Sequence, residues 1–365
     1  MEPQLDGAKG GGAMQHNIYE HYYSRDVRDS RVLVMGPFLP PIGGVSVHVS
    51  RVIASLKANN NTVYQIKTVA DCRFWCTPYH ILRFMWICFT YRPHIIHYHH
   101  SHKSHDMIEM IMVCFLKRLC KASWILIDHD CRHLYLRSKW YKKLYSLLLT
   151  SVDKLVPIGL PTHKSYRNTG VVVPAHVSVE GAFLPPYQNN ERHIWSTYPK
   201  DLEFFLQNHD KIILANAFQL SHVNGQDLYG IDLCIETFEA VHKKYPHVGF
   251  VIALAQIGDH TYFERLNSAL RAKNLHQHWY MLTGNRELWP LFKRAHVFVR
   301  PTLSDGASVS IQEALFFGVP VVASDVCERP NKVILFKNRD IFDFTEKVMC
   351  ALERSSTNPG IKGGP

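Results

Sequence analysis

The feature that most constrains the fold is a repeated alternation of short β-type apolar runs and helix-type segments. It begins at Arg31, where RVLVMG is followed by a turn rich in proline and glycine and then by apolar residues at helical spacing. Similar pairs continue as far as the run VVVPA at 171–175. Short strands separated by helices are typical of a doubly wound parallel sheet. Residues 31–185 are therefore predicted to form one α/β domain.

A polar, proline-containing stretch interrupts this alternation at residues 186–210, and we expect it to be an interdomain linker. A second strand–helix series covers residues 211–340, and a helix and tail are expected at 341–365. The sequence thus predicts an α/β protein of two Rossmann-like domains facing across a cleft. Residues 1–30 are polar, contain the run GAKGGG and are expected to be a flexible leader.

Positive charge is concentrated in the first half of the chain. The 365 residues include 41 Lys and Arg against 31 Asp and Glu. Residues 51–150 hold 15 basic and 5 acidic side chains, whereas residues 191–365 hold 19 of each. The first domain is therefore expected to bind an anionic partner.

The cysteine pattern and the apolar runs indicate the cellular compartment. The cysteines include no C-x-x-C pair, and no apolar run approaches the roughly 20 residues of a membrane span. Both observations favour a reduced, cytoplasmic protein.

The most informative motif is RPTLSDGASVSIQEALFFGVPVVASD at residues 300–325. It predicts a strand, a loop with Asp305 and Gly306, and a helix that begins near Ser308. Gly306 would let the backbone approach a ligand, and the N–H groups at the helix start suit a phosphate. Glu313 follows Asp305 after seven intervening residues, so one acid can reach a sugar and the other a nucleoside. The plain alternative is a loop acid and a solvated helix acid.

This block, together with GGVSVHV at 43–49, resembles the retaining glycosyltransferases of family 4, of the glycosyl transferases group 1 type, which adopt the GT-B fold. The resemblance runs from Arg31 to about Arg354. It implies that Asp305, which stands where the family has Glu, holds donor-sugar hydroxyls and that Glu313 holds the ribose. The other donor-binding residues that it implies are Gly43, Gly44, Gly306, Ala307, Ser308 and Val309.

Two cations of the family pattern are missing. The family usually has Gly-Arg after the first strand of the second domain and Lys before the Gly that opens its helix. Here these places read Ala217-Phe218-Gln219 and Tyr229-Gly230. Arg286, Arg300 and Arg329 are the candidate replacements at the diphosphate, with loop salt bridges as the alternative.

A histidine cluster, HIIHYHHSHKSH, holds six histidines: His94, His97, His99, His100, His102 and His105. Strand alternation sends His97 and His99 to one face and His100 to the other. No Cys or carboxylate completes a tetrahedral set at familiar spacing, so no metal is expected. By resemblance His99 is the catalytic histidine of the cleft and contacts donor or acceptor, with His100 as the alternative.

The triplet Asp128-His129-Asp130 reads as D-x-D, which binds a divalent metal in a different glycosyltransferase fold. Here it follows a buried-looking strand, WILI, in a chain that resembles GT-B enzymes, which usually need no metal. His129 is therefore the candidate on the acceptor side, and no cofactor is expected.

Basic and aromatic residues interleave in CRHLYLRSKWYKKLYSLLLT at 131–150. This mixture suits anionic lipid headgroups. Single-stranded nucleic acid, or a solvated helix over a core stripe, is the alternative. We expect a membrane surface and no nucleic acid. The membrane-contact candidates are Arg137, Lys139, Trp140, Lys142 and Lys143.

The function expected from these patterns and the resemblance is sugar transfer, hexosyl or N-acetylhexosaminyl, from a nucleotide diphosphate donor, with UDP-sugar favoured. The expected acceptor is a lipid-linked glycan or surface polysaccharide such as lipopolysaccharide, reached at the inner face of the membrane with retention of configuration. Two alternatives stay open: a GT-B nucleotide-sugar epimerase, and a non-catalytic module that binds sugar nucleotides or nucleic acid.

Overall fold

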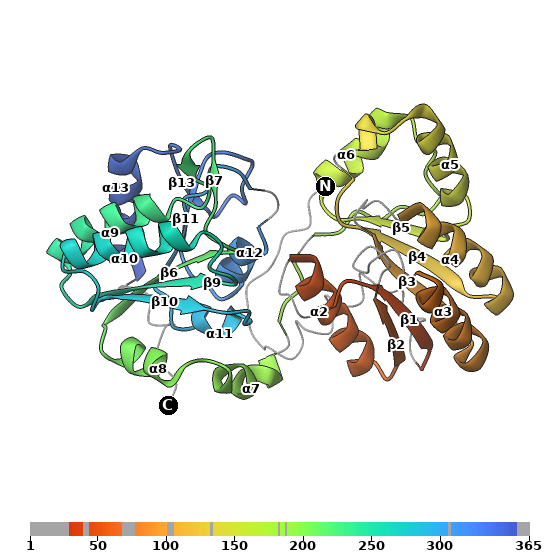
Figure 1. Ribbon diagram of the computed structural model, residues 1–365, viewed down its shortest axis with the longest axis horizontal. Helices are drawn as coiled ribbons and strands as arrows, with labels where there is room; N and C mark the ends of the chain where they lie inside the picture. The colour runs from red at the N-terminus through yellow and green to blue at the C-terminus, as the bar shows by residue number, and fades with distance from the viewer. Residues whose placement is uncertain are drawn as a thin grey trace. The chain divides into compact units, whose positions relative to one another are not determined.

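The computed structural model describes residues 29–38, 44–67, 77–100, 106–131, 134–181, 183–186, 188–305 and 308–355. They fall into two compact units, one within residues 29–185 and the other within residues 186–355. Each unit is a parallel sheet covered by helices, as the alternation predicted (Figure 1).

The first unit is built on a five-stranded parallel sheet with the order β2-β1-β3-β4-β5. Every residue of β3 is buried, as expected for a sheet with helices on both faces. The strands are β1 (Arg31–Gly36), β2 (Thr62–Lys67), β3 (Ile95–His100), β4 (Ser123–Asp128) and β5 (Lys154–Pro157).

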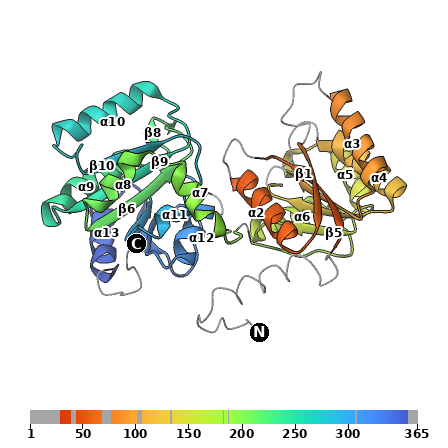
Figure 2. The ribbon, with the colours of Figure 1, turned by 90° about the horizontal axis from the view of Figure 1, so that it is seen from below.

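Helices cover both faces of this sheet. The helices are α2 (Gly44–Ala58), α3 (Thr77–Tyr91), α4 (Asp106–Cys120), α5 (Lys139–Leu149) and α6 (Leu160–Thr169), with a 3-10 turn η3 (Leu134–Leu136). On one face α3, α4 and α5 lie side by side and bury Phe84, Val113 and Tyr145 (Figure 1). On the other, α2 packs through Val49 and Val52 (Figure 2). Within the described ranges, no helix has the length and apolar character that crossing a membrane requires.

The second unit is built on a six-stranded parallel sheet with the order β10-β9-β6-β11-β12-β13. Its strands are β6 (Lys211–Ala217), β9 (Val248–Leu254), β10 (Trp279–Thr283), β11 (Val297–Arg300), β12 (Val321–Ser324) and β13 (Ile334–Phe336). A short hairpin pairs β7 (His222–Val223) with β8 (Gln226–Asp227). Helices α9 (Ile231–Lys244), α10 (His260–Ala272) and α13 (Ile341–Ser355) cover one face, and α11 (Trp289–Phe292) and α12 (Val309–Phe316) the other.

The expectation that residues 186–210 form a linker is wrong. They contain a 3-10 turn η4 (Gln188–Asn190) and the helices α7 (Glu191–Ser196) and α8 (Lys200–Gln207). Leu202 and Leu206 lie four residues apart and are buried in the same core as α11 and α12. The stretch is polar because short amphipathic helices expose most of their surface, and its narrow apolar stripe belongs to the second unit. Of the helix and tail expected at 341–365, the helix is α13 (Ile341–Ser355), which packs on α9, and residues 356–365 lie outside the described residues.

Candidate functional site

Polar side chains gather at the carboxyl ends of three adjacent strands in the second unit. Asn216 is the penultimate residue of β6, Arg300 is the last of β11, and Ser324 is the last of β12. Because these strands are parallel neighbours, their ends meet at one edge of the sheet. Open α/β sheets bind their ligands at this edge.

Two arginines share one carboxylate at this edge. Arg300 Nε lies 3.0 Å from Asp305 Oδ2, its Nη2 lies 3.2 Å from Oδ1, and Arg329 Nη1 lies 2.8 Å from Oδ2. The side chains of Arg300, Arg329 and Asp305 are only 13%, 2% and 9% exposed. Burial alone would raise the pKa of Asp305, but the two guanidinium groups hold it below its ordinary value. Two positive charges against one negative leave an excess positive charge shielded from water.

Arg329 also keeps a buried donor. Its Nη2 has no hydrogen-bond partner within the part of the chain that the structure describes. Arg300, in contrast, donates from Nη1 to the backbone oxygen of Asn216 at 3.0 Å and to its Oδ1 at 3.2 Å. A buried cationic donor without an acceptor is costly, and a bound anion would offset that cost.

The N-terminus of α12 is tied to this cluster. Asn216, which accepts from Arg300, donates from Nδ2 to Ser310 Oγ at 2.8 Å. Ser308 is the N-cap, and its Oγ accepts from the N–H of Ile311. The free N–H groups and positive dipole end of a helix favour negative charge. The α12 terminus and the two arginines together form an environment suited to a phosphate or diphosphate.

Glu313 lies in the middle of α12 and is buried. Burial, followed by the charges of Glu287 and Glu313, raises the pKa of Tyr198 above its ordinary value. The Glu313 carboxylate is therefore within electrostatic range of the segment that follows α7.

The remaining donor-side candidates are dispersed. Arg286 donates from Nε to the Thr197 backbone oxygen at 2.7 Å and from Nη1 to the Thr283 backbone oxygen. Its loop follows β10, which β9 and β6 separate from β11, so the structure does not bring Arg286 into the Arg300–Asp305–Arg329 cluster. Gly44 and Val309 open α2 and α12. Gly43, Gly306 and Ala307 lie outside the described residues.

Three imidazoles meet in the first unit. His99 lies near the carboxyl end of β3, and His129 directly follows β4. Nδ1 of His99 is 3.0 Å from Nε2 of His129. The His48 ring centroid, from α2, is 4.8 Å from that of His129 and 5.8 Å from that of His99. A Cβ on Gly36, at the end of β1, would lie 3.0 Å from the His99 Cβ, so a glycine there lets His99 approach.

Burial is the main cause that lowers the pKa of both His99 and His129, and neighbouring histidines lower it further. Both rings are therefore neutral at pH 7, and neutral imidazoles can bond a sugar hydroxyl or ligate zinc. One ligand nitrogen from each of His48, His99 and His129 lies within 4.8 Å of the others, so this set could hold a metal. His48 is not among the residues predicted from the sequence. Its position four residues after Gly44, one helical turn into α2, could have indicated that it lies near the glycine turn.

His100 points to the opposite face, as the alternation predicted. Its ring stacks on Tyr145 with centroids 5.9 Å apart, and its Nδ1 lies 4.0 Å from Asp128 Oδ1. His100 is thus separated from the His48–His99–His129 cluster. His102 and His105 lie outside the described residues.

The D-x-D alternative does not fit the geometry. Asp128 is fully buried. Its Oδ1 accepts from the Asp130 N–H at 3.0 Å, and its Oδ2 accepts from the Tyr166 hydroxyl. Asp128 therefore faces the core and cannot join Asp130 around a solvent-accessible ion.

The membrane-contact candidates surround the first turn of α5. Lys139, Trp140 and Lys143 are exposed. Arg137 lies over the Tyr141 ring, 5.1 Å from its centroid. Lys142 is half-buried and donates to the Tyr135 backbone oxygen at 2.9 Å.

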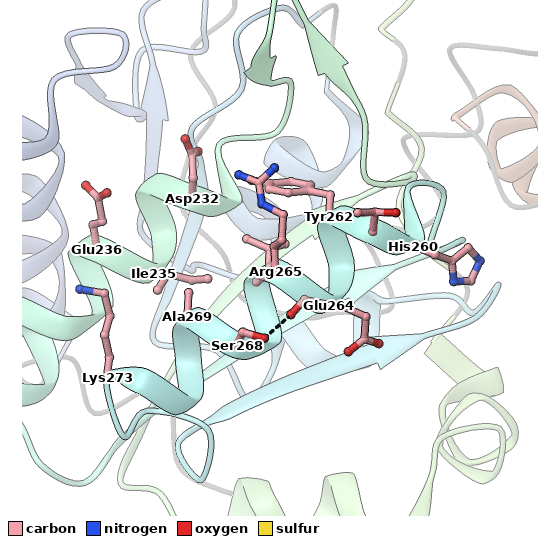
Figure 3. A pocket seen from close by; sticks show the side chains of 12 residues that line it. Asp232, Ile235, Glu236, His260, Tyr262, Glu264, Arg265, Ser268, Ala269 and Lys273 are labelled. Carbon is pink, nitrogen blue, oxygen red and sulfur yellow. Dashed lines mark hydrogen bonds between the residues drawn. The ribbon is translucent and has the colours of Figure 1, made fainter.

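A separate groove lies between α9 and α10 in the second unit (Figure 3). Two of its charged groups form ion pairs: Asp232 pairs with Arg339 at 2.6 Å, and Lys273 pairs with Glu239. The groove is lined by helix surfaces and includes none of the candidate residues.

Comparisons with known proteins agree with this architecture. Residues 217–354 match the family described as Glycosyl transferases group 1. A glycosyltransferase from Rickettsia africae superposes with a TM-score of 0.66 at 12% identity, over 92% of this chain and 91% of that one. Anabaena HepE in complex with UDP superposes with a TM-score of 0.59 at 10% identity, over 91% and 92%. The chain has the GT-B fold.

Curated relatives match more locally. An uncharacterised glycosyltransferase of Methanocaldococcus jannaschii is 21% identical over 259 residues, which cover 67% of this chain and 58% of the relative. The O-antigen biosynthesis glycosyltransferase WclY of Escherichia coli is 29% identical over 97 residues, 27% of this chain and 25% of WclY. Each match spans less than two thirds of the relative's own length. The family model and both curated relatives are thus glycosyltransferases, and the superposed structures share the GT-B fold with this chain.

Proposed function

We propose that this GT-B chain is a retaining glycosyltransferase that moves a hexosyl or N-acetylhexosaminyl group from a nucleotide diphosphate donor to a lipid-linked glycan or surface polysaccharide. The match of residues 217–354 supports transfer, the structure of HepE with UDP favours a uridine donor, and the name of WclY favours a surface-polysaccharide product. The observation that carries the proposal is the Arg300–Asp305–Arg329 cluster beside α12.

The two arginines take the place of the missing family cations. Positions 217–219 and 229–230 supply neither Arg nor Lys. Arg300 and Arg329 bring two guanidinium groups to the same edge of the sheet, and Arg329 Nη2 is a buried donor available to a phosphate oxygen. Both oxygens of Asp305 already accept from these groups. Its proposed role is therefore to hold the arginines in place rather than to bind sugar hydroxyls.

The reaction that fits this site is a front-face displacement. The acceptor oxygen bonds to the anomeric carbon while the bond from that carbon to the diphosphate oxygen breaks. The acceptor proton passes to a phosphate oxygen of the leaving group. Arg300, Arg329 and the N-terminus of α12 stabilise the charge that develops there, without a metal ion. Neutral His99 and His129 orient the acceptor hydroxyl, and Glu313 binds the ribose.

Ligand-induced thermal stabilisation tests the donor site. We expect UDP, unlike GDP, ADP or CMP, to raise the Tm of the wild-type protein, since a ligand at 100 times its Kd adds about 2.7 kcal/mol. Arg329→Ala should weaken UDP binding roughly tenfold to a hundredfold, because a charge-assisted hydrogen bond contributes about 1.5–3 kcal/mol. Arg339→Ala is the matched control, since Arg339 is also paired with an aspartate, Asp232 in the first turn of α9.

Three results would contradict this proposal. The absence of a shift with every nucleotide would exclude the donor site. Equal UDP affinity in Arg329→Ala and wild type would exclude the role of the arginines. If the nucleotide sugar is converted at the same rate with and without acceptor, the protein is an epimerase rather than a transferase.

We further place the protein at the cytoplasmic face of a membrane, without nucleic acid as a partner. The basic excess of residues 51–150 and the exposed Lys139, Trp140 and Lys143 of α5 support this location.

A further inference from the structure

The outer sides of α3, α4 and α5 expose three parallel apolar stripes. On α3 the stripe is Leu82, Trp86 and Phe89, on α4 it is Ile108, Ile111, Phe115 and Leu119, and on α5 it is Trp140 and Leu147. The spacing within each stripe is that of one helix face. The opposite sides of the same helices, with Phe84, Val113 and Tyr145, already fill the core.

These stripes belong to one surface. α3 packs on α4, and α4 packs on α5, in a single layer over the sheet (Figures 1 and 2). Trp86 is 58% exposed and Phe115 is 60% exposed, values unusual for large side chains on neighbouring helices. Soluble domains seldom leave a contiguous apolar area of this kind without a partner. We call this surface, defined by the nine residues above, the three-helix face.

Basic side chains outnumber acidic ones around the three-helix face. Exposed basic residues lie on all three helices or at their ends: Arg83, Arg118, Lys121, Lys139 and Lys143. The acidic residues in the sequences of α3, α4 and α5 are Asp106, which opens α4, and Glu109, which is buried. The partner of this face is therefore apolar over a broad area and anionic at its margin.

We propose that the three-helix face is inserted into the headgroup region of an anionic lipid bilayer. Phenylalanine, leucine and isoleucine side chains enter the acyl boundary, tryptophans lie at the interface, and the surrounding Lys and Arg contact lipid phosphates. This inference deepens the membrane location proposed above and rests on it. The main membrane contact is then made by the apolar stripes of α3 and α4 rather than by the basic start of α5. The Lys and Arg side chains attract the protein to the anionic surface.

Vesicle co-sedimentation without nucleotide tests the proposal. The full chain is mixed with vesicles of phosphatidylcholine alone and of phosphatidylcholine with phosphatidylglycerol. We expect strong partitioning to the anionic vesicles and weak partitioning to the neutral ones. The double variant Trp86→Ser/Phe115→Ser should lower partitioning roughly tenfold or more, because two large apolar groups no longer enter the lipid.

Phe204→Ser is the matched control. Phe204 is 68% exposed on α8 of the second unit, so its removal changes exposed apolar area by a similar amount elsewhere. It should leave partitioning at the wild-type value. Lys139→Glu/Lys143→Glu should reduce binding in low salt and narrow the difference between the two vesicle types.

Three outcomes would overturn the proposal: wild-type protein that stays in the supernatant, a Trp86→Ser/Phe115→Ser variant that sediments like wild type, or a wild-type dimer that this variant dissociates. The last would identify the face as an interface between copies of the chain. Circular dichroism and the UDP thermal shift of each variant report folding and donor binding separately. A failure of lipid docking is thus distinguished from a failure of the proposed function.

Discussion

At the scale of single residues, Asp305 determines how the second unit presents positive charge. Its carboxylate receives hydrogen bonds from both Arg300 and Arg329 in a site largely closed to water. Removing the carboxylate would leave two like charges close together without the group that orients them. The effect of Asp305 on ligand binding should therefore extend to every ligand that carries the diphosphate.

We expect Asp305→Ala to weaken UDP and UDP-sugar by the same factor, roughly tenfold or more, through the loss of arginine positioning. Isothermal titration of both ligands measures the two affinities. If Asp305 instead binds sugar hydroxyls, UDP affinity will stay at the wild-type value and only the UDP-sugar will bind more weakly. Arg339→Ala again serves as the control for a broken ion pair outside the site.

His97 makes the folding stability of the first unit depend on pH. Burial, and then the charge of Lys154, lowers the pKa of His97 to about 3. Between pH 6.5 and about 3 the unfolded chain therefore binds a proton that the folded chain does not, so folding is weakened as the pH falls through this window. Each such group contributes up to about 1.4 kcal/mol per pH unit.

Urea unfolding at a series of pH values between 7 and 4.5 would measure this slope. His97→Gln should lose about 1.4 kcal/mol less stability per pH unit than wild type below pH 5.5. His176→Gln, which changes an exposed imidazole of the same unit, should keep the wild-type slope. Equal slopes in His97→Gln and wild type would contradict the assignment.

The sequence identified several site residues but not their partners. Arg300, Asp305, His99 and His129 stood out because their types and positions at strand ends indicated binding chemistry. The pairing of Asp305 with Arg329 spans 24 residues and depends on how the loop after β12 folds back. Local pattern carries no information on such a contact, so the resemblance alone indicates the donor sugar for Asp305, and the contacts with Arg300 and Arg329 add a second role to test.

At the scale of elements, the N-terminus of α9 packs against the loop that follows β11 and carries Asp305. Gly230 caps α9 with a φ of +67°, and a Cβ there would fall on the backbone oxygen of Pro301. A side chain at position 230 would be strained by the left-handed backbone and would clash with Pro301. The helix and the site loop therefore support each other.

Gly230→Ala should destabilise the second unit by about 2–4 kcal/mol, since it adds a steric clash with backbone to the cost of a positive φ. Gly318→Ala is the matched control: its φ is +73°, but a Cβ would have no neighbour within 4 Å. It should cost about 1 kcal/mol. Denaturant unfolding of both variants gives the difference, and equal losses would show that the contact with Pro301 is unimportant.

Apolar runs and helical spacing predicted most of the strands and the longer helices. Ten strands of the two sheets and the helix after Ser308 follow from their apolar patterns, whereas β13 was not predicted and the run VVVPA at 171–175 forms no strand. The helices α7 and α8 were missed because their apolar stripe is only one or two residues wide. The three-helix face was missed for the opposite reason: α3 and α4 are apolar on both sides, so sequence cannot tell which side meets the sheet.

At the scale of the whole molecule, the proposed diphosphate site would take its positive charge from side chains and a helix N-terminus. With Arg300, Arg329 and a helix N-terminus in this role, transfer should not require a divalent cation. We expect dialysis against EDTA to leave the rate of sugar transfer unchanged. Suppose instead that EDTA abolishes activity and that zinc restores it in the wild type but not in His48→Ala. This result would assign a metal to the His48–His99–His129 cluster.

The layer of α3, α4 and α5 has a consequence for how an acceptor arrives. Because this layer runs parallel to the sheet, a lipid-bound first unit would hold its strands along the bilayer plane. The carboxyl ends of β3 and β4, with His99 and His129, would then open sideways. An acceptor anchored in the same leaflet could reach them by lateral diffusion, so the encounter becomes two-dimensional. The rate of transfer would then depend on the number of acceptors per unit of membrane area. Added inert lipid would lower this rate even when the total amount of acceptor is constant.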